Sequence, residues 1–198
     1  MELKNTDKSR ALAIGNFDGV HVGHQHLLNT LIQKAKEKNL TPSVMMFEPH
    51  PLEVLEKESA PCVINTIEER IEIIKSLGIE DINVIKFTKE FSQITARDFI
   101  EKYVYEKLNT KLLIVGYDWR YGARREGEFE LAKEMGKRFG FEVIPAHAYK
   151  LNGHIVSSTL IRRLLKEGNL KEVRNYLGRT YSIRRKVIRG KGLGSKIG

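Results

Sequence analysis

Two histidines and a run of glycines fall within one short segment near the start of the chain, Gly15-Asn-Phe-Asp-Gly-Val-His-Val-Gly-His24. The segment follows an apolar run at residues 11–14 and precedes an amphipathic run at residues 25–38, so the order predicts a strand, a glycine-rich turn and a helix. Such a turn directs backbone N–H groups and the positive end of a helix dipole toward an anion. His21 and His24 add imidazole donors at the same helix start. The segment is typical of a phosphate-binding site.

Three further segments with polar or aromatic side chains lie just after predicted strands. They are residues 48–51, 117–122 and 156–162. In an open α/β sheet, ligands bind outside the carboxyl ends of the strands, so these segments and the first one are expected to converge at one edge. This convergence predicts a single site assembled from four parts of the chain.

The pattern of apolar residues predicts the strands and helices that hold these segments in place. Near-continuous apolar runs suit strands buried on both faces, and their alternation with helical spacing predicts a doubly wound, parallel α/β sheet. Thr66 with Glu69 forms a capping-box pattern, Asn152-Gly153 predicts a hairpin, and Ser157-Ser158 is expected to cap a helix. The predicted strands are residues 11–15, 43–47, 83–87, 112–116 and 141–145, and the predicted helices are residues 25–38, 67–77, 96–108, 127–139, 159–166 and 170–176.

The net charge of +9 is concentrated at the end of the chain. The last twenty residues carry seven of the 34 bases and no acid, which leaves 27 bases against 25 acids in the rest. We therefore predict a nearly neutral domain over residues 1–178 and a basic, β-rich fragment over residues 179–198, which is too short for its own core. Nucleic acid and membranes are not expected as partners. A single cysteine and the lack of an apolar leader indicate a cytoplasmic protein.

The pairing of His21-x-Gly-His24 with Ser157-Ser-Thr-x-Ile-Arg162 resembles the signatures of the HxGH nucleotidyltransferases, which have a Rossmann-like fold. With Phe47-Glu-Pro-His-Pro and Val115-Gly-Tyr-Asp-Trp-Arg-Tyr-Gly, the chain resembles the prokaryotic bifunctional riboflavin kinase/FMN adenylyltransferase family, also called FAD synthetase. Trp119 and Tyr121 stand where that family usually has phenylalanine. The tail is similar to the opening of the family's kinase module, whose metal and nucleotide motif would begin past Gly198. Riboflavin kinase activity is therefore expected only if the native chain continues.

The resemblance implies adenylyl transfer, in which FMN and ATP give FAD and pyrophosphate. It implies Mg²⁺ carried by ATP, no protein ligands to a metal, and only small nucleotides as partners. The oligomeric state stays open. The catalytic residues it implies are His21, His24 and Arg162; the ATP-binding residues are Gly15, Asn16, Phe17, Gly23, Ser157, Ser158 and Thr159; and the FMN-binding residues are Phe47, Pro49, His50, Asp118 and Trp119.

Other interpretations of the same residues remain open at this point. Another nucleotidyltransferase acting on a different phosphorylated small molecule would share the two signatures, and a basic tail could bind RNA or an acidic partner. His21, His24 and His26 could bind zinc, although their spacing does not place all three on one helix face. Ser157 could be only an N-cap, and His50 only the cap of a rigid turn.

Overall fold

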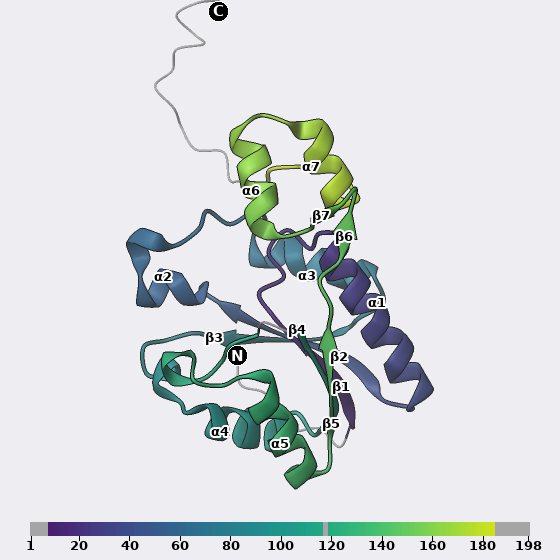
Figure 1. The fold of residues 1–198 in the computed structure, drawn as a ribbon, viewed down its shortest axis with the longest axis vertical. Coiled ribbons are helices and arrows are strands. Elements are labelled where there is room, and N and C mark those ends of the chain that lie inside the picture. Colours follow the sequence, from purple (N-terminus) through teal and green to yellow (C-terminus); the bar gives the residue numbers. More distant parts are fainter. Residues whose placement is uncertain (1–7, 117–118, 185–198) are drawn as a thin grey trace, which may run out of the picture.

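Figure 1 shows the computed structural model, which describes residues 8–116 and 119–184. Its five central strands pair in parallel in the order β3-β2-β1-β4-β5, with helices on both faces, which confirms the predicted doubly wound α/β fold. The elements are β1 (Arg10–Ile14), α1 (Val22–Glu37), β2 (Thr41–Glu48), α2 (Pro51–Leu55), η1 (Lys57–Ser59), α3 (Ile67–Ser76), β3 (Asp81–Lys86), η2 (Phe91–Gln93), α4 (Ala96–Asp98), η3 (Phe99–Lys107), β4 (Thr110–Gly116), η4 (Ala123–Arg125), α5 (Phe129–Phe139), β5 (Glu142–Ala146), β6 (Lys150–Leu151), β7 (His154–Ile155), α6 (Ser158–Lys166) and α7 (Leu170–Leu177).

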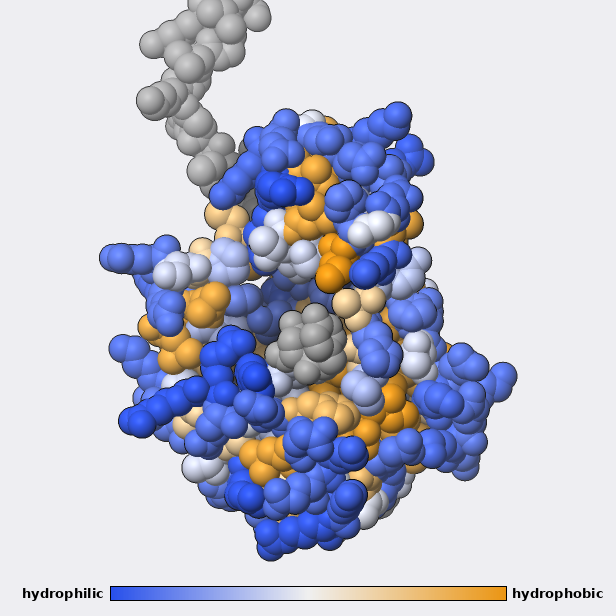
Figure 2. All heavy atoms as spheres, in the orientation of Figure 1, coloured by the Kyte–Doolittle hydropathy of each residue, from blue (hydrophilic) through white to orange (hydrophobic). Residues whose placement is uncertain are grey.

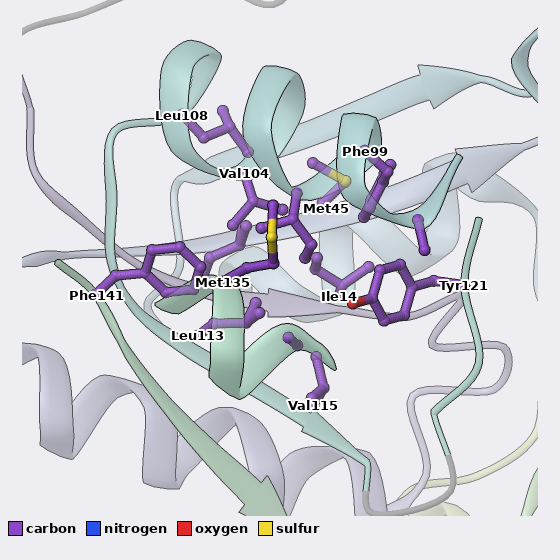
Figure 3. Packing of buried hydrophobic residues seen from close by; sticks show 14 of the residues in the cluster. Ile14, Met45, Phe99, Val104, Leu108, Leu113, Val115, Tyr121, Met135 and Phe141 are labelled. Carbon is purple, nitrogen blue, oxygen red and sulfur yellow. The ribbon is translucent and has the colours of Figure 1, made fainter. Parts of the chain in front are cut away.

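The central strand β1 divides the core into two layers. All five of its residues are buried, and successive side chains point to opposite faces. Ala11 and Ala13 pack toward α1 and α3, whereas Leu12 and Ile14 pack toward η3 and α5. Figure 3 shows the second of these layers, with Ile14 among residues of η3 and α5. Burial on both faces explains why the strand sequences are continuously apolar.

The order of the strands reverses next to β1. From β1 the chain adds β2 and β3 on one side, then returns to place β4 and β5 on the other. Loops leaving β1 and β4 then run to opposite faces, and the crevice between them is where sheets of this type bind ligands. The glycine-rich segment follows β1 directly, so the fold puts it at this switch point.

A third layer lies above the carboxyl ends of the strands. After β5 the chain forms the short hairpin β6–β7, then α6 and α7 (Figure 1). Their apolar residues form a separate cluster that includes Ile64, Val156, Ile161 and Leu177. Because Ile64 belongs to the segment before α3, this cluster fixes α6 and α7 against the loops of the sheet.

Most local expectations are met. Thr66 and Glu69 form the predicted capping box, and Asn152 and Gly153 have the positive φ values of a tight hairpin turn, 51° and 81°. The predicted helix over residues 96–108 differs, because it is a short α4 followed by the π-helix η3. Apolar spacing over nine residues does not separate α from π hydrogen bonding, so this change was not predictable from the residue pattern. No helix within residues 8–116 and 119–184 is both long enough and apolar enough to cross a membrane.

Candidate active site

His21 ends the segment after β1 and serves as the N-cap of α1. Its Nδ1 accepts a hydrogen bond from the backbone N–H of His24 at 3.2 Å. The pKa of His21 is lowered to about 4, chiefly by burial; a backbone hydrogen bond raises it in part, and the guanidinium groups of Arg179 and Arg162 contribute smaller decreases. The ring is therefore neutral at pH 7. Since Nδ1 is an acceptor, the proton is assigned to Nε2, which becomes a donor for a ligand.

His24 lies one turn into the helix and stacks on His21. The ring centroids are 3.6 Å apart and the planes differ by 16°. A Cβ atom on Gly23 would approach Nδ1 of His21 to 3.2 Å, so the glycine between the histidines lets the first ring fold back over the helix start. Burial, then the neighbouring His21, lower the pKa of His24 well below its usual value. Its Nδ1 is buried without a hydrogen-bond partner in the described part of the chain, whereas most buried polar atoms in proteins have one.

Asp18 connects the two halves of the site. Its carboxylate, 3% exposed, accepts hydrogen bonds from the backbone N–H groups of Ile64 and Asn65. It also forms an ion pair with Nη2 of Arg162 at 2.5 Å, while Nε of the same arginine donates to the carbonyl of Cys62. Nη1 of Arg162 makes no hydrogen bond within residues 8–116 and 119–184. The arginine is thus held on two sides, with one donor group left for a ligand.

The start of α6 supplies the second half of the site. Ser157 is its N-cap, and its hydroxyl accepts from the N–H of Leu160 at 3.2 Å. The hydroxyl of Ser158 donates to the carbonyl of Asp18 at 2.8 Å, and Thr159 is exposed one residue later. This contact joins the start of α6 to the loop that leads into α1. The two predicted signatures therefore meet, and two positive helix ends lie at one place.

Asn16 is held by a residue that the sequence did not single out. Arg70, on α3, is 2% exposed and donates from Nη1 to the carbonyl of Asn16 at 2.8 Å. Its Nη2 forms an ion pair with Glu48 at 2.9 Å, so one guanidinium connects the loops after β1 and β2. The Oδ1 atom of Asn16 is buried and lacks a partner among the described residues. Gly15 has no room for a Cβ without displacing the ring of Phe17, at 3.3 Å.

An aromatic cluster lies on the face of the sheet that packs against η3 and α5. Phe47 and Trp119, both predicted to bind FMN, each lie 6.4 Å from the ring of Phe99, and Trp119 stacks on Tyr121 at 4.0 Å. We define this aromatic cluster as Phe47, Phe87, Phe91, Phe99, Tyr103, Trp119 and Tyr121. The structure therefore brings two of the predicted FMN residues together.

The other predicted FMN residues are placed differently. Pro49 follows a cis peptide bond after Glu48. His50 caps α2, with Nδ1 accepting from the N–H of Leu52 at 3.2 Å. Burial, and next the charge of Arg162, lower the pKa of His50. Asp118 lies outside the described residues.

The surface above these residues is hollowed. Figure 2 shows a recess below the lobe formed by α6 and α7, bordered by both hydrophilic and hydrophobic residues. In the part of the chain that the structure describes, no group of three or more His, Cys, Asp or Glu residues could hold a metal ion. The rings of His21 and His24 stack on each other, whereas His26 is exposed and its ring lies 5.0 Å from that of Tyr149. This geometry disfavours the zinc interpretation.

A doubly wound parallel sheet with two histidines at the helix start beside its switch point, and an arginine on a facing helix, has the α/β architecture of nucleotidyltransferase-like folds. A family model described as FAD synthetase matches residues 3–160. The chain therefore belongs to the FAD synthetase family.

Individual relatives agree with this assignment. A bifunctional riboflavin kinase/FMN adenylyltransferase from Buchnera aphidicola (subsp. Schizaphis graminum) is 41% identical over 99% of this chain and 63% of its own length. Proteins of the same description from Escherichia coli K12 and Listeria monocytogenes are 36% and 33% identical, over 94% and 98% of this chain and 60% and 61% of their own. The chain thus spans about three fifths of these relatives.

A solved structure shares the fold. It is described as a macrolide-efflux protein from Streptococcus pneumoniae, and its TM-score is 0.80 at 28% identity over 99% of this chain and 65% of that chain.

Proposed function

We propose that this chain is an FMN adenylyltransferase, which transfers AMP from ATP to FMN and releases pyrophosphate and FAD. The observation that carries the proposal is the stacked pair His21–His24 at the start of α1, joined through Asp18 to Arg162 on α6. Membership of the FAD synthetase family supports FMN as the acceptor. The curated relatives are named for the same reaction.

The chemistry requires positioning more than proton transfer. A phosphate oxygen of FMN forms a bond to the α-phosphorus of ATP, the bond between the α-phosphorus and its bridging oxygen breaks, and pyrophosphate leaves with the electron pair. A phosphate monoester has a second pKa of about 6, so the attacking oxygen is already ionised at pH 7 and needs no general base. Catalysis then comes from holding the groups in line and stabilising the charge that develops.

The described residues suit these two tasks. His21 and His24 are neutral at pH 7, so they act as fixed hydrogen-bond donors to the triphosphate without first binding a proton. Arg162, oriented by Asp18, supplies the permanent positive charge for the leaving phosphates through its Nη1. Gly15, Asn16, Phe17, Gly23 and the hydroxyls of Ser157, Ser158 and Thr159 complete the proposed ATP side.

Mg²⁺ fits this site as a part of the bound ATP. The carboxylate of Asp18, in the proposed ATP-binding loop, is used by Arg162 and two backbone N–H groups. Phosphate oxygens and water would therefore hold the ion, as is usual for Mg²⁺. When bound, it neutralises charge on the leaving phosphates.

The binding site for FMN is proposed to lie along the aromatic cluster. Phe47 and Trp119 offer planar, apolar surfaces of the kind that a flavin ring contacts, and they lie at the ends of β2 and β4. Pro49 and His50, which follow β2 directly, are proposed to contact FMN next to this surface. Asp118 stays a proposed contact to FMN.

The test uses the full chain with ATP, Mg²⁺ and one acceptor at a time. The acceptors are FMN, nicotinamide mononucleotide, phosphopantetheine and glycerol 3-phosphate, and the products are separated by chromatography while pyrophosphate release is measured. We expect FAD and pyrophosphate in equal amounts from FMN, and turnover of the other acceptors at least 100-fold slower. Turnover with another acceptor at a rate equal to or above that with FMN would overturn the proposal.

A further inference from the structure

Arg179, the first residue after α7 and its capping Gly178, reaches back to the segment that holds His21. Nη2 donates to the carbonyl of Gly19 and to Oδ1 of Asn65, both at 2.8 Å. Nη1 donates to the carbonyls of Val20 and Leu177, both at 3.3 Å. One guanidinium thus gathers four acceptors, two of which belong to the residues just before His21.

The segment held in this way has a strained backbone. Phe17, Gly19 and Val20 have φ values of 48°, 84° and 36°. A β-branched residue such as Val20 rarely adopts a positive φ, so surrounding contacts must hold it there. Gln25 adds a second link, because its Nε2 donates to the carbonyls of Val20 and Leu177 at 2.8 and 2.9 Å. The two side chains together tie the end of α7 to the loop before α1.

The position of this contact matters for the reacting groups. Val20 immediately precedes His21, so a change in the backbone at residues 19 and 20 moves the N-cap ring and the His24 ring stacked on it. Arg179 is also close enough for its charge to act on His21. By contrast Arg184, five residues on, forms an exposed ion pair with Glu72 on α3.

We propose that Arg179 is a positioning residue for adenylyl transfer, which clamps Gly19 and Val20 so that His21 and His24 present their donors to the ATP phosphates. The inference rests on the proposed function. It also extends the functional unit by at least one residue beyond the boundary that the sequence predicts at residues 178 and 179.

The test compares R179Q, R179K and the matched control R184Q in the full chain, with kcat and KM for FMN measured by FAD formation. We expect R179Q to lower kcat at least tenfold with KM for FMN within twofold, and R179K to recover part of the loss because it keeps the charge but fewer donors. R184Q removes the same charge from the same tail and is expected to match the parent chain. A folded R179Q with kcat within twofold of the parent overturns the inference.

A second readout separates positioning from general stability. The ring of His21 is followed by NMR as the pH is lowered in the parent chain, R179Q and R184Q; the charged or titratable groups that act on it in the parent chain are Arg162, Arg179 and His24. Loss of the adjacent cation is expected to raise the pKa of His21 in R179Q but not in R184Q; an equal rise in both contradicts the assignment.

If R179Q does not fold, the milder N65A removes one acceptor of Arg179, and it is expected to lower kcat at least threefold without loss of the folded state. Folded N65A with unchanged kcat then counts against the clamp. Absence of FAD formation by the parent chain is a different result, because it overturns the proposed function.

Discussion

Substitution of Asp18 by asparagine is expected to damage both the stability and the activity of this protein. The carboxylate is 3% exposed and accepts from two backbone N–H groups and from Arg162. Asparagine keeps the shape but turns one acceptor into a donor, so it must oppose either a backbone N–H or the guanidinium. Breaking a buried ion pair costs about 3–5 kcal/mol. Because the Arg162 side chain is 19% exposed and its charge keeps some contact with water, we expect about 2–3 kcal/mol for Asp18→Asn.

The effect on turnover follows from the same contact. Without Asp18, Arg162 keeps only its bond to the Cys62 carbonyl and no longer holds Nη1 in a fixed direction. Loss of one positioned donor to a developing charge costs about 10²–10³ in kcat. We therefore expect kcat for FAD formation to fall about 100-fold, measured at a temperature where urea unfolding shows that the variant is folded.

Asp81→Asn is the matched control. Asp81 pairs with the buried Arg10 at 2.6 Å, at the amino ends of β3 and β1, on the edge of the sheet away from the site. This variant is expected to lower the free energy of unfolding while kcat stays within twofold of the parent. Two results would contradict the proposed role of Asp18 in orienting Arg162. In the first, folded Asp18→Asn retains kcat within threefold of the parent; in the second, both variants lose activity equally.

Two further predictions concern stability. Between pH 6.5 and about 4 the unfolded chain binds a proton on His21 that the folded protein does not, so the free energy of unfolding falls as the pH is lowered, by up to about 3 kcal/mol from this residue. Urea unfolding at pH 7, 6 and 5 checks this, and His21→Gln should reduce the slope; an unchanged slope contradicts it. The Tyr121 hydroxyl is buried beside Ile14 (Figure 3) without a partner among the described residues, and burial raises its pKa. Tyr121→Phe should therefore stabilise the protein by about 1 kcal/mol, and a lower Tm would contradict this.

The fold was predictable because its signals are local. Strands buried on both faces need continuous apolar runs, and β1, β2 and β4 show them. Helix N-caps are also recognisable from short residue patterns, such as the capping box that Thr66 and Glu69 form at the start of α3. The π-helix η3 was not predictable, since the choice between α and π hydrogen bonding depends on packing around Phe99 rather than on spacing. The domain boundary at residues 178 and 179 stays a prediction, and residues 185–198 of the tail lie outside the described residues.

The site was predictable only in part. His21, His24, Ser158 and Arg162 come from short signatures, and the structure brings them together. Asp18 was missed as a functional residue, although an acid within a phosphate-binding loop would repel its ligand unless a cation paired with it, and this was an available signal. No sequence pattern indicated a role for Arg70 or Arg179, because their partners Asn16 and Gly19 lie 54 and 160 residues away in the sequence.

We propose that the two histidines and Arg162 act on the transition state of adenylyl transfer to FMN. A comparison of kcat for FAD formation with the Kd for FMN, in the parent chain and in His24→Ala under the same conditions, tests this most directly. We expect kcat to fall at least 100-fold while Kd changes less than threefold, because the lost interaction belongs to the transition state. Equal losses in kcat and in FMN binding, or no FAD from the parent chain, would contradict it.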